Sequence, residues 1–293
     1  MAYNALCLLP NIFFSQRART AQIIRNVISR TITYDRESMA VMLKDFGDPR
    51  KVLTLEKIQI KPPSEREVLV KMLMAPINPS DINMIEAYRL LKDYVRLEDG
   101  DLIIQNGANS AVGECVIQLA KEWNIKSVNI VRDRPDIDTL KTHLIGLGAT
   151  HVVTEEFARS KEMKDLLNSY TNKPKLALNC VGGKSATELV RFLREKGTMV
   201  TYGGMSKQPV IIPTGALIFK EVRILGYWNT QWNLENKNSS EKREMYKKLC
   251  ELIRNCKLVP PICELVPLLE FKDGIEKSLT GFQNRKKVLV MQE

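Results

Sequence analysis

The pattern that most constrains the fold lies between residues 101 and 232, where short apolar runs alternate with longer segments of helical apolar spacing. The runs expected to form strands are residues 102–105, 128–131, 151–153, 176–181, 198–202 and 222–227. Residues 111–123 and a segment through Leu140 and Leu144 have the spacing of amphipathic helices. Strand–helix alternation repeated this often predicts an α/β fold with a doubly wound parallel sheet.

Two further regions flank this alternation. Residues 39–74 alternate in the manner of strands, and the three strands expected there are residues 40–43, 52–58 and 68–73. Turn-forming sequences at residues 47–49 and 61–64 separate them. The tail predicts a short strand, a helix near residues 271–279 and a last strand at residues 287–291.

The first 34 residues are basic and carry no acidic side chain. Arginines stand at positions 17, 19, 25 and 30, with serines, threonines and apolar residues among them. This is the composition of a mitochondrial transit peptide, which predicts residues 1–34 as a removable leader and the mitochondrial matrix as the location. A disordered basic arm is the alternative interpretation. No apolar run approaches the length of a membrane span.

Charge and cysteine usage narrow the function classes. The net charge of +10 is too diffuse outside the leader to predict nucleic-acid binding, and it better suits an acidic ligand or carrier. The six cysteines form no C-x-x-C pair, and only two histidines are present. Residues 39–100 contain neither residue type. A catalytic zinc site is therefore not expected, and no metal is predicted.

The first expected strand of the alternation runs into the turn Asn106-Gly107-Ala108-Asn109-Ser110-Ala111-Val112-Gly113. Small residues let a backbone approach a pyrophosphate, and the helix that follows offers free N–H groups and a favourable dipole. The spacing is a degenerate form of the glycine-rich dinucleotide motif. We interpret Asn109, Ser110, Ala111 and Val112 as cofactor-binding, although any strand–turn–helix unit needs small residues.

The second strand of the alternation ends in Arg132-Asp133-Arg134. Sites for NAD usually have an acidic residue at this place, whereas the 2′-phosphate of NADP pairs with guanidinium groups. Two arginines around the aspartate therefore favour NADPH as the cofactor. A solvated cluster of loop charges is the simpler alternative.

Two later strand ends carry further candidates. Tyr202-Gly203-Gly204-Met205 follows one strand, and consecutive glycines suit a place where a cofactor passes close to the backbone. Tyr227-Trp228-Asn229 follows the next strand and would form a wall of the nicotinamide pocket. A plain turn and ordinary core aromatics are the competing interpretations.

Four runs of the sequence, residues 78–83, 131–136, 178–185 and 197–205, resemble the mitochondrial trans-2-enoyl-thioester reductases. These belong to the zinc-free, quinone-oxidoreductase-like branch of the medium-chain dehydrogenases and reductases. The resemblance extends over residues 39–291. It implies a Rossmann domain joined to a GroES-like β domain. It also implies NADPH-dependent reduction of a 2-enoyl thioester, carried on acyl carrier protein or CoA, in mitochondrial fatty acid synthesis.

The resemblance also implies roles for particular residues. Residues 109–112 would lie at the pyrophosphate and residues 132–134 at the 2′-phosphate. Residues 202–205 and 227–229 would line the nicotinamide side, and Lys286 matches a lysine that reaches the cofactor. Ala111 stands where the family has glycine, so an extra methyl group would loosen the approach of the helix to the cofactor.

The sequence departs from the family after Ile85. There the family continues into a Gly-Asn-Tyr segment with the catalytic tyrosine and then most of the GroES-like domain, whereas this chain runs into the helix that enters the nucleotide domain. Tyr88 matches a helix tyrosine, so no catalytic residue is assigned. The expected domains are a GroES-like domain shortened to residues 35–88, a Rossmann domain at 89–257 and a returning segment at 258–293. A homodimer through the edge strand at residues 222–227 is expected. The alternative function is a shortened form that binds NADPH or a partner without turnover.

Overall fold

The computed structural model describes residues 36–77, 83–279 and 286–291 of the 293-residue chain. The expected transit peptide, residues 1–34, lies outside the described residues. The chain divides into two compact units, the smaller made of residues 1–78 and 262–293 and the larger of residues 79–261. Each unit is described below by itself.

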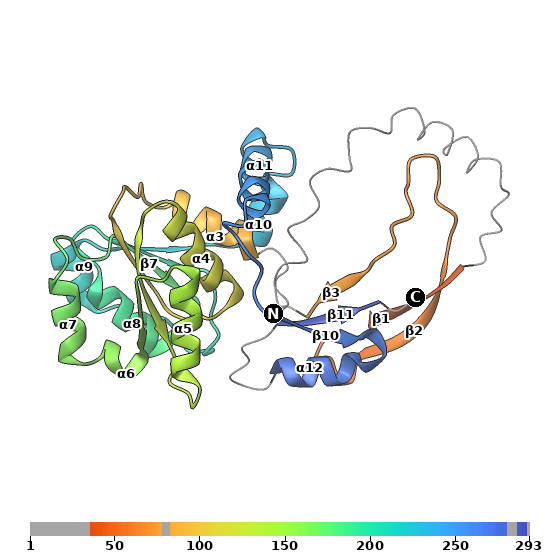
Figure 1. The fold of residues 1–293 in the computed structure, drawn as a ribbon, viewed down its shortest axis with the longest axis horizontal. Coiled ribbons are helices and arrows are strands. Elements are labelled where there is room, and N and C mark those ends of the chain that lie inside the picture. The colour runs from red at the N-terminus through yellow and green to blue at the C-terminus, as the bar shows by residue number, and fades with distance from the viewer. Residues whose placement is uncertain (1–35, 78–82, 280–285, 292–293) are drawn as a thin grey trace. The chain divides into compact units, whose positions relative to one another are not determined.

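The larger unit is built on a parallel sheet of six strands in the order β6-β5-β4-β7-β8-β9 (Figure 1). The strands are β4 (Leu102–Gln105), β5 (Lys126–Val131), β6 (His151–Thr154), β7 (Leu176–Asn179), β8 (Thr198–Thr201) and β9 (Arg223–Gly226). Each lies within two residues of the place predicted from the sequence. The predicted doubly wound α/β fold is therefore confirmed.

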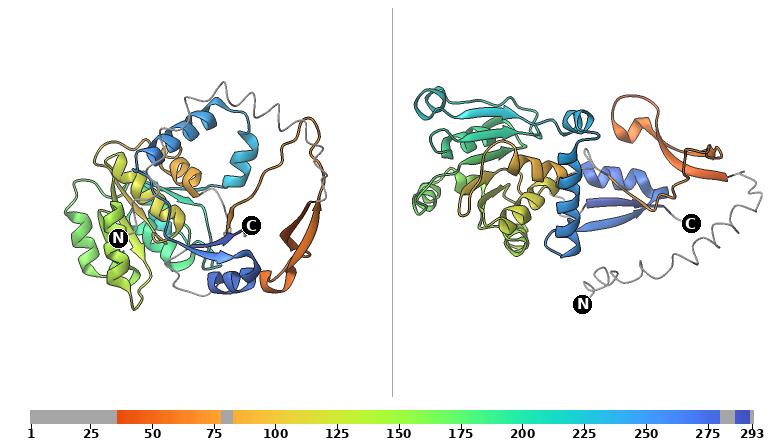
Figure 2. Two further views of the ribbon diagram at one scale, coloured as in Figure 1. Left: turned by 45° about the vertical axis from the view of Figure 1, so that its right-hand side comes forward. Right: turned by 90° about the horizontal axis from the view of Figure 1, so that it is seen from above.

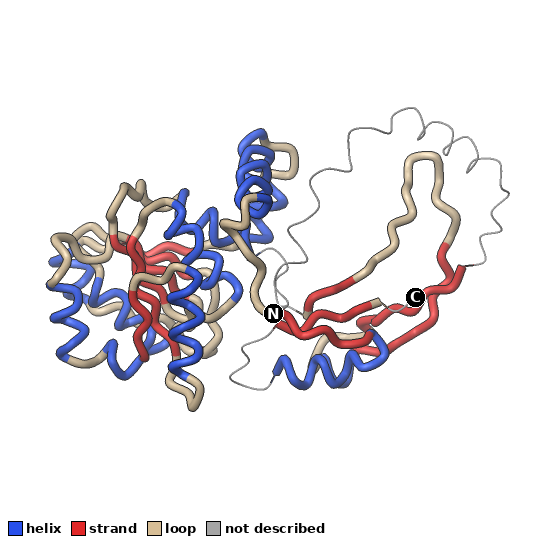
Figure 3. Tube along the Cα trace, viewed as in Figure 1, coloured by secondary structure: helices blue, strands red, loops and turns tan. Residues whose placement is uncertain are grey.

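Helices cover both faces of this sheet, as Figure 3 shows by colour and Figure 2 from two other sides. The helices of the unit are α3 (Asn83–Lys92), α4 (Ala111–Glu122), α5 (Ile137–Leu147), α6 (Glu155–Ala158), α7 (Lys161–Asn168), α8 (Gly183–Phe192), α9 (Thr214–Lys220), α10 (Asn229–Glu235) and α11 (Ser240–Arg254). Side chains of β4 alternate between two cores. Ile103 packs with α3 and α4, whereas Leu102 and Ile104 pack on the other face with α7 and α8.

The boundary expected between residues 88 and 89 falls inside α3. This helix packs along α4 and contributes Ile85, Leu90 and Leu91 to the core of the larger unit. The contacts divide the chain near residue 78 instead. Within the described residues, no helix is both long enough and apolar enough to cross a membrane.

The smaller unit contains two separate sheets. Strands β1 (Arg36–Leu43) and β2 (Leu53–Ile60) form an antiparallel pair, and the short helix α2 (Pro49–Val52) lies in the segment that connects them. Strands β10 (Cys263–Pro267), β11 (Lys286–Val290) and β3 (Met74–Pro76) form the second sheet, in which β10 and β11 are parallel. The turn η1 (Leu268–Glu270) and helix α12 (Phe271–Leu279) connect β10 to β11.

The strand predicted at residues 68–73 is wrong. These residues belong to the long loop that joins β2 to β3 in Figure 1, and strand structure begins only at Met74. Val68 is 83% exposed and Leu73 is 62% exposed. The apolar residues of this segment have strand propensity, but a strand also needs a neighbour that accepts its backbone hydrogen bonds.

Candidate functional site

The loops at the carboxyl ends of the six parallel strands form the candidate site. The strand order reverses direction between β4 and β7, because the chain moves outward from β4 to β6 and then returns to β7. In open α/β sheets, ligands bind outside the carboxyl ends of the strands at such a reversal. The described part of the larger unit therefore has the architecture of a nucleotide site, and its loops decide the chemistry.

The turn from β4 into α4 is tight and is stabilised by hydrogen bonds between its own residues. Gly107 has a φ of +57°, which favours glycine, and the Ser110 hydroxyl accepts a hydrogen bond of 3.1 Å from the Gly113 N–H. A Cβ added at Gly113 would lie 2.5 Å from the carbonyl oxygen of Ala108, so no side chain fits there. The helix therefore starts directly against the turn, with the first N–H groups of α4 available to an anion.

An amide network joins the strand ends at the reversal. The Asn106 side chain donates to Asn179 Oδ1 at 2.9 Å, and Asn106 Oδ1 accepts from the Cys180 N–H at 2.9 Å. Asn179 donates in turn to the Thr201 hydroxyl at 3.1 Å. Asn106 and Asn179 are completely buried. The network joins β4, β7 and β8 at their ends. Sequence reasoning missed it, although an asparagine at the end of both β4 and β7 is a signal that could have predicted it.

The end of β5 presents its two arginines differently. Arg132 and Asp133 are exposed, as a site for a 2′-phosphate requires. Arg134 is buried, with its Nε 4.0 Å from Asp136 Oδ1, and this burial lowers the pKa of its guanidinium. Arg132 is therefore the guanidinium that lies at the surface of this edge.

The loop after β8 packs against the loop after β7. The N–H of Tyr202 donates to the Asn179 carbonyl at 2.9 Å, and the N–H of Met205 donates to the Cys180 carbonyl at 3.0 Å. A Cβ at Gly203 would lie 3.1 Å from that same carbonyl, whereas a Cβ at Gly204 would meet nothing within 4 Å. The backbone at Gly204 is thus open to a ligand, and Met205 beside it is exposed.

The loop after β9 carries the last predicted residues of the larger unit. The Tyr227 hydroxyl donates to Asn229 Oδ1 at 2.9 Å, and the ring of Tyr94 meets Tyr227 edge-on with centroids 6.2 Å apart. Trp228 is 67% exposed and Asn229 is buried. Burial raises the pKa of the Tyr202 and Tyr227 hydroxyls, so both stay protonated near neutral pH.

The structure thus brings the predicted residues of four strand ends to one edge of one sheet. These are Asn109, Ser110, Ala111, Val112, Arg132, Asp133, Arg134, Tyr202, Gly203, Gly204, Met205, Tyr227, Trp228 and Asn229. Lys286 differs, because it is the first residue of β11 in the smaller unit. In the described parts of the chain, no three His, Cys, Asp or Glu side chains gather as a metal ion would require.

Sequence reasoning missed Glu86 in the first turn of α3. Its side chain is buried, and burial raises the pKa of its carboxyl to about 7. Glu86 is a lesser cause, after burial, of the raised pKa of the Cys180 thiol and of the Tyr202 and Tyr227 hydroxyls. A lone glutamate in a helix of mixed charge gave no sequence signal of this position.

The chain is similar to dehydrogenases and enoyl reductases. A family model described as zinc-binding dehydrogenase matches residues 111–252. The mitochondrial enoyl-(acyl-carrier-protein) reductase of Xenopus tropicalis is 40% identical over 332 aligned residues, covering 86% of this chain and 95% of that protein.

Solved structures agree. The complex of Etr1p with NADP and crotonyl-CoA has a TM-score of 0.79 and 26% identity, covering 87% of this chain and 100% of that chain. The Etr1p/Etr2p heterodimer of mitochondrial 2-enoyl thioester reductase from Candida tropicalis has a TM-score of 0.75 and 26% identity, covering 87% of this chain and 100% of that chain.

The aligned stretch has an informative length. It runs over 332 residues with the Xenopus protein, yet the whole of this chain has only 293. The relative therefore contains residues within that stretch that have no counterpart here. This agrees with the expectation of an internally shortened chain.

Proposed function

This chain belongs to the family of mitochondrial enoyl-(acyl-carrier-protein) reductases, and from that membership we propose which of its residues carry the family's chemistry. The family function is the NADPH-dependent reduction of trans-2-enoyl thioesters to saturated acyl thioesters, and its location is mitochondrial. The expected cofactor and reaction class follow from this membership. The residue roles below are our proposal.

The residues at the carboxyl edge fit a dinucleotide. The glycine at position 113 brings the start of α4 against the turn. The pyrophosphate would lie beside Asn109 and Ser110 and accept from the N–H groups of Ala111 and Val112 in the first turn of α4. The exposed guanidinium of Arg132 would pair with the 2′-phosphate, flanked by Asp133 and supported by Arg134. This tight turn at the reversal of strand order is the observation that carries the proposal.

The nicotinamide half would lie along the next two loops. The open backbone at Gly204, next to the tightly packed Gly203, leaves room for the cofactor, and the sequences 202–205 and 227–229 would form the pocket wall. NADPH, when bound, supplies the hydride that is added to the β-carbon of the enoyl thioester. The residues of this chain bind and orient it, and they exclude water from it. Lys286 of the smaller unit is proposed as a further contact, by family resemblance alone.

The proton for the α-carbon has no assigned donor in this chain. The family's catalytic tyrosine falls in the segment for which the sequence has no counterpart. Loss of a general acid typically costs about 10²–10⁴-fold in rate. We therefore keep the second candidate, a shortened form that binds NADPH or a partner without turnover. The exposed apolar segment 68–73 of the smaller unit, which does not form a strand, favours it.

The assembly is proposed to be a homodimer through the free edge of the sheet. Strand β9 is the last strand in the order of the sheet, and exposed apolar side chains at Ile218, Phe219 and Leu225 lie on it and on α9. An unpaired strand edge with such neighbours is a surface that another chain can extend. The thioester substrate is carried on acyl carrier protein or CoA.

The first test is consumption of NADPH by the full chain with crotonyl-CoA. We expect oxidation that depends on the thioester and is about 10²–10⁴-fold slower than that of a relative with the tyrosine. The control is Arg132→Ala combined with Arg134→Ala, which should lose NADPH binding. A wild-type rate no faster than this control would leave only the candidate without turnover. No NADPH binding by the wild type would contradict the reductase and leave only a form that binds a partner.

A further inference from the structure

Two consecutive amide side chains at the end of β4 bind the strands on either side of it. Gln105 donates to the Gly113 carbonyl at 3.1 Å and to Asn129 Oδ1 on β5 at 2.8 Å. Asn106 donates to Asn179 Oδ1 on β7 at 2.9 Å. All four amide side chains are completely buried. Strand β5 leads to the residues assigned to the 2′-phosphate, whereas β7 and β8 lead to the nicotinamide side.

The Asn179 side chain organises the loop that follows β7. Its Oδ1 also accepts from the N–H groups of Val181 at 3.2 Å and Gly182 at 3.0 Å. Its Nδ2 donates to the Thr201 hydroxyl, at the end of β8, at 3.1 Å. On the other flank of the loop, a Cβ added at Gly182 would lie 2.7 Å from the carbonyl oxygen of Gln208. The loop is therefore fixed by one side chain and by close packing opposite it.

The loop after β7 packs directly against both neighbouring loops. A Cβ added at Gly107, in the turn after β4, would lie 2.5 Å from Cys180 Sγ. The Cys180 N–H donates to Asn106 Oδ1 at 2.9 Å, and its carbonyl accepts from the Met205 N–H at 3.0 Å. Because closely packed groups transmit a displacement to their neighbours, the position of residues 180–183 affects the spacing of the loops on either side.

We propose that Asn179 is a positioning residue for the nicotinamide half of the cofactor, acting through the loop after β7 and through Asn106. It sets the spacing between the turn assigned to the pyrophosphate and the loop at residues 202–205. A dinucleotide engages both places at once, and the second half adds affinity only where the geometry permits simultaneous contact. The inference rests on the proposed NADPH site and deepens it.

The test compares NADPH with adenosine 2′,5′-bisphosphate by calorimetry on the full chain. This fragment has the 2′-phosphate and the first phosphate of the pyrophosphate, but it lacks the nicotinamide. The Kd of the fragment divided by the Kd of NADPH therefore measures the affinity that the nicotinamide half adds. Asn179→Ala removes the acceptor of the Val181 and Gly182 N–H groups and should lower this ratio about tenfold, the size of one buried hydrogen bond.

Two further variants separate positioning from a general loss of stability. Asn179→Asp keeps an oxygen for the N–H groups of the loop, and its second oxygen can accept from the Thr201 hydroxyl, so it should keep the wild-type ratio. Asn129→Ala is the matched control, because Asn129 is an equally buried asparagine of the same sheet. It should lower stability but leave the ratio within about twofold, since its bonds lie on the other side of β4.

The same ratio decides against the proposal in three ways. It would be overturned by an unchanged ratio in Asn179→Ala, or by an equal fall in Asn179→Asp or in Asn129→Ala. A fragment that binds the wild type as tightly as NADPH does would also overturn it, while the assignment of the adenosine half would stand. Failure of both ligands to bind the wild type would instead remove the proposed cofactor site, and this inference with it.

A milder pair of variants covers the case in which Asn179→Ala does not fold. Thr201→Val keeps the shape of the side chain but offers no acceptor to Asn179 Nδ2, so the ratio should fall about threefold. Thr201→Ser retains the hydroxyl and should keep the wild-type ratio. Equal ratios for Thr201→Val and the wild type, or equal falls in both variants, would overturn the proposal.

Discussion

The two units of this chain differ in how their strands are paired and in how far their apolar side chains are buried. In the larger unit all six strands pair in one sheet, and side chains such as Leu90, Ile103 and Leu176 are fully excluded from water. In the smaller unit the strands divide into a pair and a three-stranded sheet, while Phe46 is 96% exposed. The larger unit therefore has a hydrophobic core of its own. The smaller unit leaves apolar side chains such as Phe46 exposed.

This difference bears directly on function. The proposed cofactor site lies on the larger unit, apart from Lys286. In this chain the part assigned to the cofactor is the well-packed part. Cofactor binding and turnover are thus separable properties here, and measurements that treat them separately are the informative ones.

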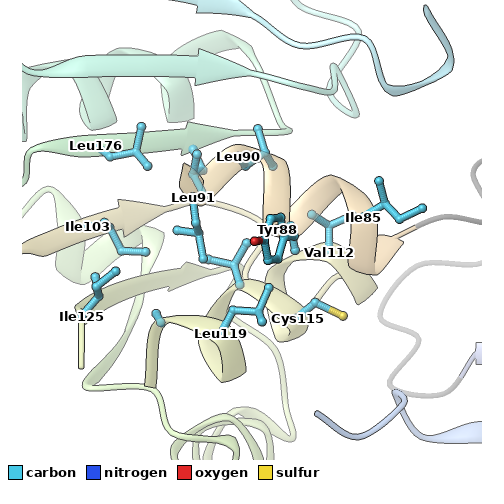
Figure 4. Close-up of a cluster of buried hydrophobic side chains, with 14 of the residues drawn as sticks. Ile85, Tyr88, Leu90, Leu91, Ile103, Val112, Cys115, Leu119, Ile125 and Leu176 are labelled. Atoms are coloured by element: carbon cyan, nitrogen blue, oxygen red, sulfur yellow. The ribbon is translucent and has the colours of Figure 1, made fainter. Parts of the chain in front are cut away.

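The largest expected effect comes from truncating one leucine in each unit. Leu90→Ala removes a fully buried side chain of α3 (Figure 4) and should destabilise the larger unit by about 2–5 kcal/mol. Leu73→Ala, in the exposed loop of the smaller unit, should change stability by less than about 0.5 kcal/mol. Calorimetric unfolding of both variants measures the contrast. Similar losses at both positions would mean that the loop is covered in solution.

A smaller effect, dependent on pH, is expected from Glu86→Gln. The folded protein holds the pKa of this carboxyl at about 7, above its ordinary value of 4.5. Below pH 4.5 the group is protonated in both folded and unfolded chains, so the variant should match the wild type. As the pH rises to 7, the unfolded chain ionises first and the wild type loses stability. Above pH 7 the glutamine should be more stable, by at most about 3 kcal/mol.

Denaturant titration at several pH values measures this difference. Lys287, a buried cation of the smaller unit, is paired with Glu264. Replacing this glutamate should change stability in the opposite direction to Glu86→Gln. Glu264→Gln should lower stability near pH 7, since it leaves Lys287 without this partner. A stability gain in Glu264→Gln would contradict the pairing of Lys287 with Glu264. No stability gain in Glu86→Gln above pH 7 would contradict a Glu86 carboxyl whose ionisation is opposed by burial.

The smallest effect separates structure from binding within the larger unit. Ser110 and Ser239 cap α4 and α11 through equal hydrogen bonds of 3.1 Å. Changing either to alanine should cost about 1 kcal/mol. Only Ser110→Ala should also weaken NADPH binding, because α4 starts at the edge proposed to bind the pyrophosphate. Equal NADPH affinities for the two variants would place the pyrophosphate elsewhere.

Most of the larger unit could be predicted from the sequence because its signals are local. Short apolar runs such as residues 102–105 are bounded by turns, and Gly107 and Gly113 mark the tight turn that follows. The same reasoning failed at residues 68–73. Their apolar character is also local, but whether they form a strand depends on a partner elsewhere in the chain.

The candidate site shows the same limit. The strand ends at Arg132, Tyr202 and Tyr227 could be predicted, because parallel strands bring their carboxyl ends to one edge. The burial of Arg134 and Glu86 could not, because it depends on how other elements cover those side chains. Sequence patterns thus predict which loops form the candidate site, whereas the protonation of the groups around it follows only from packing.

The order of segments along the chain has a consequence for how the protein is made. Residues 79–261 of the larger unit are contiguous, so that unit can collapse during synthesis as soon as they are available. Strand β3 pairs with β11, which follows the whole of the larger unit in sequence. The three-stranded sheet therefore closes last, and until then β3 lacks the neighbouring strand that it has in the folded unit.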